Sequence, residues 1–267
     1  MQALSHLISG CSVRARLCLY ALTALFVAVS FLPWGLAVAQ TPAAAALPQP
    51  ASTGAWNLPG EWAWMAGNDQ IKQPGVYPTL GQASGTATPG ARGYAAGWQG
   101  RDGRLWLFGG AGFDSAGNRA ELNDLWAWDP ATLQWAWMGG SSSVGCDVCG
   151  PAGVYGAKGV PSAANIPGGR GSMMYWLGRD GNFWLFGGLG FDAAGQEDPL
   201  NDLWQYNPSS GQWTWWSGAK KTGPTGYQPG GYGTLGVPAA ANTPGSRIGG
   251  ATWVDSDGNL WLYGGFG

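Results

Sequence analysis

The apolar positions of this chain gather in short, dense runs that stop abruptly on glycine. The most regular run spans Leu105 to Gly110 (LWLFGG) and recurs as Phe183 to Gly188 (FWLFGG) and as Leu260 to Gly265 (LWLYGG). A run of this length, bounded by turn residues, is too short for a helix and is typical of a buried strand. The glycines allow a sharp bend or the close passage of a neighbouring strand. The pattern therefore predicts a repeated β-structure.

The sequence around each run also repeats. An Asp-Gly pair, typical of a hairpin turn, precedes each run, with an arginine further upstream. These positions are Asp102-Gly103, Asp180-Gly181 and Asp257-Gly258, and Arg92, Arg170 and Arg247. Further apolar segments are LNDLWAWDP from Leu122, LNDLWQYNP from Leu200, QWAWM from Gln134 and QWTWW from Gln212, with EWAWM from Glu61 as an earlier copy of the last type. Phe108 and Phe186 lie 78 residues apart, and Tyr263 lies 77 residues further on, so the chain repeats one unit.

Each unit contains four predicted strands in a fixed order: an Arg-led strand, a Gly-Gly strand, an Asn-Asp-Leu-Trp strand and a Trp-x-Trp strand. Four strands per repeat without a helical pattern indicate the blade of a β-propeller. The Gly-Gly doublet and the tryptophan of the fourth strand make the chain resemble the kelch-repeat family. The longer loops resemble the propeller domain of galactose oxidase-like proteins. Another antiparallel architecture, such as a β-solenoid, stays open as an alternative.

The resemblance implies an all-β, kelch-type propeller of four-stranded antiparallel blades over residues 56–267, with repeats at about 61–133, 134–211 and 212–267. These repeats amount to an incomplete propeller of about two and a half blades. Propellers close with about four to eight blades. We therefore expect this sequence to be part of a longer protein, in which Glu61 to Met65 completes the last blade. If the chain is such a fragment, self-association stays open as an alternative.

The first residues differ in composition from the repeats. Arg14 and Arg16 precede an apolar run, and Ala37 and Ala39 form an A-x-A cleavage site. This order is typical of a secretory signal peptide over residues 1–39, and the alternative is an uncleaved membrane anchor. An Ala/Pro-rich linker, predicted to be disordered, covers residues 40–55. The protein is thus expected to be secreted, periplasmic or on the cell surface, with no stable membrane span after cleavage.

Cleavage removes the single histidine, His6, and leaves 11 basic and 15 acidic side chains, a formal net charge of −4. This charge does not predict nucleic-acid binding. The remaining cysteines, Cys146 and Cys149, are half a zinc site without a histidine to complete it, so we expect no metal and no cofactor. In an exported protein they are expected to form a local disulfide, with a free thiol pair as the alternative.

Strand direction places the long loops of each predicted blade on one side. The loop between the second and third strands and the loop to the next blade emerge together, and loops on a rigid scaffold are where binding sites normally lie. From these loops we select Tyr155, Phe191, Asp192 and Tyr232 as candidate binding residues. Because the same residue types recur in each repeat, the sequence favours the alternative that these residues hold the loops in place.

No catalytic constellation is visible in the sequence after the cleavage site. Galactose oxidase-like copper enzymes use histidine ligands, so the resemblance in fold does not bring the oxidase activity with it. The sequence favours a secreted or cell-surface binding or scaffold module that presents its long-loop face to a protein or glycan partner. The alternative is the N-terminal part of a carbohydrate-active enzyme whose catalytic residues lie outside this segment.

Overall fold

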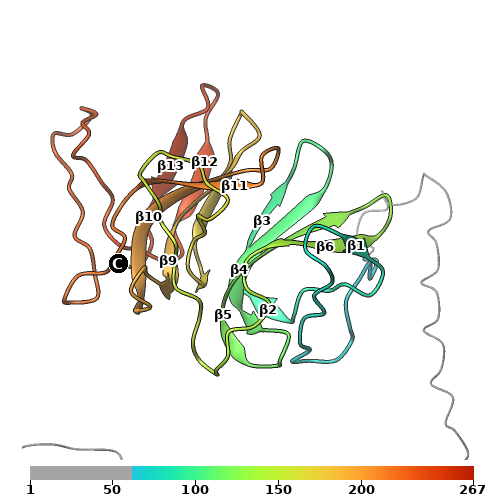
Figure 1. Cartoon of the computed structure of the whole chain (residues 1–267). Helices are drawn as coiled ribbons and strands as arrows, with labels where there is room; N and C mark the ends of the chain where they lie inside the picture. The colour runs from blue at the N-terminus through green and yellow to red at the C-terminus, as the bar shows by residue number, and fades with distance from the viewer. Residues whose placement is uncertain (1–61) are drawn as a thin grey trace, which may run out of the picture. The chain divides into compact units, whose positions relative to one another are not determined.

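Thirteen strands make up the computed structural model, which describes residues 62–267. The predicted signal peptide and linker, and residues 56–61, lie outside the described residues. Among the residues described there is no helix, and so none long and apolar enough to cross a membrane. Every strand pairing is antiparallel, as the repeats predict for an all-β propeller built from blades (Figure 1).

Blade 1 follows the predicted order of four strands. From the inside outward its strands are β2 (Arg92–Gly93) and β3 (Ala96–Gln99), β4 (Leu105–Phe113), β5 (Arg119–Asp129) and β6 (Gln134–Gly139). The short β1 (Ala83–Ser84) pairs with the outer edge of β6. The Arg-led strand is split because Tyr94 takes a left-handed conformation, with a φ of 61°. Both halves, β2 and β3, still pair with β4.

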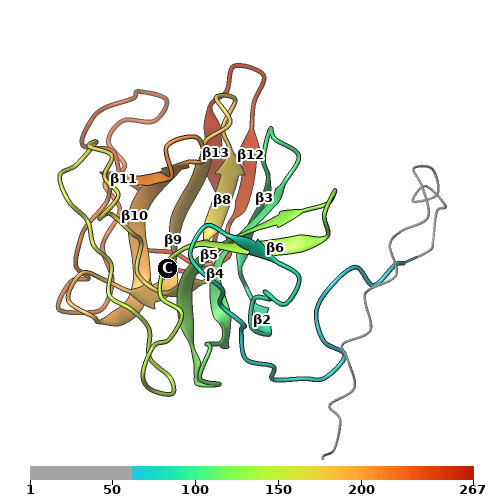
Figure 2. The ribbon, with the colours of Figure 1, turned by 45° about the vertical axis from the view of Figure 1, so that its right-hand side comes forward.

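Blade 2 repeats this arrangement, and a third blade begins. The strands of blade 2 are β7 (Arg170–Gly171), β8 (Met174–Leu177), β9 (Phe183–Phe191), β10 (Glu197–Asn207) and β11 (Gln212–Ser217). The third sheet consists of β12 (Ala251–Val254) and β13 (Leu260–Tyr263). The inner strand β8 contacts β3 on one side and β12 on the other, so the blades fan out from these strands (Figure 2).

The blades pack against one another through aromatic rings. Phe108 of blade 1 lies 5.0 Å from the ring of Trp213 in blade 2, and Trp106 lies 5.8 Å from Tyr206, measured between ring centroids. The indole Nε1 of Trp98 donates to the backbone oxygen of Trp176 at 2.9 Å. Large rings contribute strongly to such a core through the apolar area that they bury. The rings of the Trp-rich strands therefore form the core between blades.

The Gly-Gly pairs bring neighbouring blades close together. Gly187 has a φ of 60°, and a Cβ there would lie 2.7 Å from the carbonyl oxygen of Leu200 and 2.8 Å from that of Arg247. The amide of Gly188 donates to the same Arg247 oxygen at 3.0 Å. The doublet is therefore required both for its backbone conformation and for the close approach of the next blade.

The segment that was expected to complete the last blade is not a strand here. Residues 62–65 have no strand pairing, and the side chains of Trp62 and Trp64 are exposed. Their proposed role as a closing strand stays a prediction.

Candidate functional site

Tyr155, the first candidate binding residue, lies in a buried polar cluster of blade 2. Its hydroxyl donates to Asp202 Oδ2 at 2.6 Å, and only 3% of the residue is exposed. Asp202 also accepts from both terminal nitrogens of Arg170, at 2.7 and 2.8 Å, and from Trp204 Nε1 at 2.7 Å. Burial raises the pKa of the Tyr155 hydroxyl well above its usual value, and the Asp202 carboxylate adds to the rise. This geometry gives Tyr155 the role of fixing its loop to the blade.

The same cluster occurs in blade 1, where Tyr77, Arg92 and Trp126 surround Asp124. In each case the arginine bonds to an aspartate of its own blade. The side-chain hydrogen bonds of Arg92 and Arg170 therefore lie within one blade. The backbone of Arg247 contacts blade 2, where the amide of Gly188 donates to its carbonyl oxygen at 3.0 Å.

Phe191 and Asp192 are buried at the turn between β9 and β10. Asp192 is 1% exposed and accepts backbone N–H bonds from Ala194, Gln196 and Thr222. Burial alone would raise the pKa of this carboxyl, but these hydrogen bonds lower it below its ordinary value. The structure therefore places Phe191 and Asp192 where they hold the loop, with no free face for a ligand. Tyr232, by contrast, is 73% exposed, and its hydroxyl accepts from Arg247 Nη2 at 3.2 Å.

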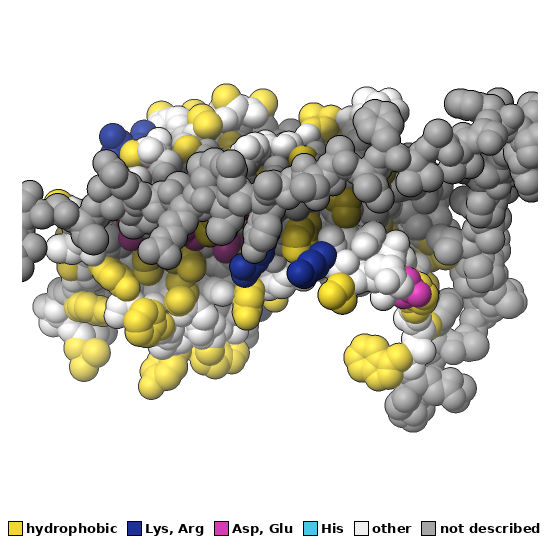
Figure 3. Space-filling model, turned by 90° about the horizontal axis from the view of Figure 1, so that it is seen from below, with side chains coloured by type: hydrophobic (Ala, Val, Ile, Leu, Met, Phe, Trp, Pro, Cys, Tyr) yellow, Lys and Arg dark blue, Asp and Glu magenta, His cyan; other side chains and the backbone are white. Residues whose placement is uncertain are grey.

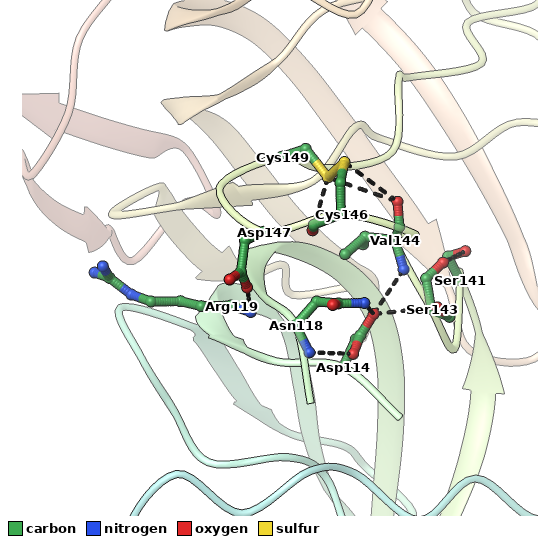
Figure 4. Close-up of a disulfide and its surroundings, with 9 residues drawn as sticks. All are labelled: Asp114, Asn118, Arg119, Ser141, Ser143, Val144, Cys146, Asp147 and Cys149. Atoms are coloured by element: carbon green, nitrogen blue, oxygen red, sulfur yellow. Dashed lines mark hydrogen bonds between the residues drawn. A yellow bond between two sulfur atoms is a disulfide. The ribbon is translucent and has the colours of Figure 1, made fainter. Parts of the chain in front are cut away.

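Cys146 and Cys149 lie together in the loop between blades 1 and 2, with their sulfur atoms 2.12 Å apart as a disulfide (Figure 4). The closed loop runs parallel to the start of β5: Val148 N donates to Arg119 O, and Glu121 N donates to Cys149 O. Asp147 accepts from the Arg119 amide at 2.8 Å. The disulfide loop therefore lies beside β5 on the long-loop side of blade 1.

The carboxylate of Asp114 anchors the part of this loop that precedes Cys146. Asp114, in the β4–β5 turn, accepts from Val144 N at 2.9 Å and from the hydroxyl of Ser143, as well as from Asn118 within its own turn (Figure 4). The long-loop face is thus a set of loops tied to each other through buried aspartates. Figure 3 shows this side of the molecule, where apolar side chains cover much of the visible described surface and charged ones are few.

A pocket of about 180 Å³ lies between these loops and blade 2. It is lined by Ala111, Arg119, Ala120, Glu121, Val148 and Glu197. Glu121 and Arg119 come from the start of β5, Glu197 from the start of β10, and Val148 from the disulfide loop. The pocket therefore brings the ends of two blades together with the disulfide loop.

Glu121 is the chemically distinctive group of this pocket. Its Oε2 is buried and has no hydrogen-bond partner among the described residues. Burial raises the pKa of Glu121 to about 7, the nearby carboxylate of Glu197 adds to the rise, and Arg119 opposes it. A buried acceptor without a partner is costly, and a ligand donor would satisfy it. The pocket is thus suited to a small group that donates hydrogen bonds, such as an amine or a hydroxyl.

The repeats differ in chemistry at this pocket. Arg119 and Glu121 of blade 1 correspond to Glu197 and Pro199 of blade 2. The disulfide loop likewise occurs only after blade 1 within residues 62–267. Sequence reasoning selected residues shared by the repeats and so missed this site, although the alignment of RAELNDLW with EDPLNDLW contains the signal. No group of three or more His, Cys, Asp or Glu side chains that could hold a metal occurs in the described part of the chain.

No family model matches the sequence, and no curated protein matches it. Among solved structures, the chain is similar to YjhT, with 16% identity, a TM-score of 0.38, and coverage of 67% of this chain and 60% of that one. It is also similar to a fungal alcohol oxidase of the AA5 family in complex with copper, with 14% identity and a TM-score of 0.16, over 50% of this chain and 45% of that one. The chain thus spans less than two thirds of the length of either protein. At these scores the likenesses say nothing about activity.

Proposed function

We propose that this chain is part of an exported, kelch-type propeller that acts as a binding module. Its partner is a protein or a glycan that presents an amine or a hydroxyl group to the pocket at Glu121. The observation that carries the proposal is that the residues that break the repeat gather there, next to a long loop closed by a disulfide. Shared residues serve blade packing, whereas a site for one partner needs residues that differ between repeats.

The chemistry of the pocket supports recognition of a hydrogen-bond donor. The two carboxylates, Glu121 and Glu197, make its lining acidic, and Arg119 offsets this charge in part. Val148, exposed on the disulfide loop, adds an apolar contact. A protonated lysine side chain or a sugar hydroxyl can donate to Glu121 while its carbon atoms contact Val148. The pocket is small, so the exposed loops around it would supply further contact area.

The proposal is tested by screening the full chain against purified glycans and lysine-containing peptides. Any ligand found is then titrated against Glu121→Gln, Glu197→Gln and Asp180→Asn. Asp180 is the matched control, because it is an exposed carboxylate in the hairpin turn on the opposite side. We expect the two glutamate variants to bind about tenfold more weakly, as for the loss of one charge-assisted hydrogen bond, and the control to bind normally. Equal weakening in the control, or none in the glutamate variants, would contradict the proposal.

A carbohydrate-active enzyme is the second candidate, and one observation favours it. A carboxyl with a pKa of about 7, as in Glu121, is suited to general acid–base catalysis near neutral pH. Incubation with aryl glycosides tests this candidate. Turnover that is lost in Glu121→Gln and kept in Asp180→Asn would support the enzyme. Binding without turnover would support the binding module.

A further inference from the structure

A second pocket lies on the hairpin side of the molecule, opposite the long loops. It measures about 650 Å³ and lies where the β3–β4 hairpin of blade 1 meets the β8–β9 hairpin and the β10–β11 turn of blade 2. Its lining includes Arg101, Arg104, Asp180, Asn182, Asn207 and Ser209. All of its lining residues belong to blades 1 and 2, so the pocket is part of the contact between two neighbouring blades.

Arg104 breaks the repeat in this pocket. Asn182 stands at the same place in blade 2 and donates from Nδ2 to Asp180 Oδ2 at 2.6 Å. Arg104 makes the equivalent bond, from Nε to Asp102 Oδ2, also at 2.6 Å. The arginine carries two further nitrogens, Nη1 and Nη2, and within residues 62–267 these have no hydrogen-bond partner. The hairpin bond is thus kept, and two donors are added to the pocket.

Ring packing holds Arg104 at the contact between the blades. Its guanidinium carbon lies 5.0 Å from the centre of the Trp106 ring. Trp106 in turn lies 5.8 Å from Tyr206 of blade 2, measured between ring centroids. The charge of Arg104 also opposes the rise of the Tyr206 pKa to about 12, which burial causes. An arginine held in this way loses little side-chain entropy when it binds a ligand.

Arg101 is a second donor to the same pocket. A Cβ at Gly181 would lie 2.9 Å from Arg101 Cδ and 3.1 Å from its Nε, so the arginine side chain crosses from blade 1 onto the hairpin of blade 2. Gly181 itself is buried. Among the described residues, Arg101 forms no salt bridge. Two arginines of blade 1 thus offer N–H groups to one pocket.

The carboxylates of the pocket limit the charge of its ligand. Asp102 pairs with Arg104. Asp180 accepts from the amide and the side chain of Asn182, at 3.0 and 2.6 Å, so its oxygens already have donors. The two aspartates balance the two arginines in formal charge, and a ligand with several negative charges would meet repulsion. The free N–H groups of a guanidinium fit a single planar carboxylate, which they bind as a pair.

The rest of the lining suits a sugar better than a peptide. Asn182, Asn207 and Ser209 provide amide and hydroxyl groups, which both donate and accept hydrogen bonds. Asn207 Oδ1 accepts from the Ser209 amide at 2.9 Å, which leaves Nδ2 of Asn207 as a donor. Pro208 is the one apolar side chain of the lining, so the pocket offers little surface to the side chains of a peptide.

We propose that this pocket binds a hexuronate unit of an acidic polysaccharide, a sugar that carries one carboxylate and several hydroxyl groups. The carboxylate pairs with Arg104 and Arg101, and the hydroxyl groups bond to Asn182, Asn207 and Ser209. The site lies on the opposite side of the molecule from the pocket at Glu121 and is independent of the function of that pocket.

The test measures the binding of trigalacturonate to the full 267-residue chain by calorimetry, beside the methyl ester of the same oligomer. The ester keeps the hydroxyl groups and lacks the charge. We expect the ester to bind roughly ten- to a hundredfold more weakly, because charge-assisted hydrogen bonds are lost. At the pocket of Glu121 the order would be reversed, since two glutamates line it and repel the free acid. The comparison therefore separates the two sites.

Protein variants complete the test. Arg104→Asn is the main variant, because an asparagine makes the same hairpin bond in blade 2 and the fold is expected to stay intact. It should weaken binding of the free acid about tenfold and leave that of the ester unchanged, and Arg101→Gln should act in the same direction. Arg179→Gln is the matched control and should bind as the natural chain does. Arg179 lies over Gly258 as Arg101 lies over Gly181, but outside the pocket.

Equal binding of the free acid and the ester would overturn the proposal, as would undiminished binding of the free acid to Arg104→Asn. No measurable binding of trigalacturonate would also overturn it. A peptide with blocked ends and a single glutamate is the last comparison, and we expect it to bind more weakly than trigalacturonate. Binding of this peptide that is as tight as that of trigalacturonate would mean that the pocket recognises an acidic protein segment, and would contradict the assignment of a sugar.

Discussion

At the scale of single residues, blades 1 and 2 each contain one buried ion pair. In blade 2 the side chains of Arg170 and Asp202 are both fully buried, and every polar atom that the aspartate offers is bonded. Their net contribution relative to apolar residues can be small, because burying two charges is costly. Loss of one partner is costly, because the charge of the other partner then stays buried without compensation.

The first prediction concerns this pair. Asp202→Ala should lower the free energy of unfolding by about 3–5 kcal/mol, because it leaves the buried Arg170 charge unpaired. Arg104→Ala, which breaks the exposed pair with Asp102, should lower it by about 1 kcal/mol or less. Urea denaturation of both variants gives the comparison. Similar losses of unfolding free energy in the two variants would show that the buried pair contributes no more than the exposed pair.

The second prediction is a pH dependence that comes from Glu121. Its pKa is about 7 in the folded chain and has an ordinary value of 4.5. The folded state therefore holds the proton more tightly, so the stability from this group is complete below pH 4.5 and is lost as the pH rises to about 7. Glu197 and Arg119 are the charged groups that face it.

This loss should disappear in Glu121→Gln. Unfolding midpoints are measured for both proteins between pH 4 and 8, and the difference between them is plotted against pH. The natural chain should lose stability relative to the variant across the stated range. A difference that does not change with pH would mean that Glu121 titrates normally.

At the scale of elements, the strands were predicted well and the loops were not. The Gly-Gly runs, the Asp-Gly hairpins and the strand order could be predicted because alternation, turn residues and repetition are local signals. The partners of Asp192 and Tyr155 could not, since these bonds join residues 30 and 47 positions apart. The pocket at Glu121 depends on how the starts of β5 and β10 approach each other, which no local pattern contains.

The third prediction tests the Gly-Gly doublet as an element of blade contact. Gly187→Ala should lower stability by more than about 3 kcal/mol, because it combines a positive φ with a steric clash at two backbone oxygens. Gly195→Ala is the control, since Gly195 has a φ of 75° and free space around its Cα. It should cost about 1 kcal/mol through backbone strain alone. Urea denaturation gives the stability loss of both variants. Equal losses would show that the close approach of the blades adds nothing to the cost of a side chain at Gly187.

The fourth prediction concerns the loop that contains Cys146 and Cys149. A non-reduced digest of exported protein should contain the peptide two mass units light, as for one disulfide. Cys146→Ser should lower stability by about 2 kcal/mol or less, because the closed loop is short. The same variant should weaken ligand binding at the Glu121 pocket, which Val148 helps to line. Quantitative alkylation of both thiols without reductant would contradict the prediction.

At the scale of the whole molecule, the third sheet exposes the surface that the other blades bury. Trp253, Trp261 and Tyr263 are 55, 56 and 75% exposed, whereas the matching Trp98, Trp106 and Phe108 are 5, 2 and 0% exposed. A contiguous apolar surface of this kind marks a site of association.

The fifth prediction is that this face makes the 267-residue chain self-associate. Its sedimentation coefficient should rise with concentration, and it should rise less in the double variant Trp253→Gln, Tyr263→Gln. Tyr94→Gln is the control, because Tyr94 is also exposed but lies in blade 1. A sedimentation coefficient that is constant over the whole concentration range would contradict the prediction.

The hydrogen bond from Trp98 to Trp176 joins two tryptophans that are 78 residues apart and occupy the same place in successive blades. The indole of Trp176 in turn donates to the backbone oxygen of Trp261 in the third sheet at 2.9 Å, so the same contact recurs between successive blades. A gene segment that encodes one such unit can be duplicated or deleted in frame, and the surfaces on either side of the change still match. Unequal recombination between such copies would therefore change the number of blades without new packing having to evolve.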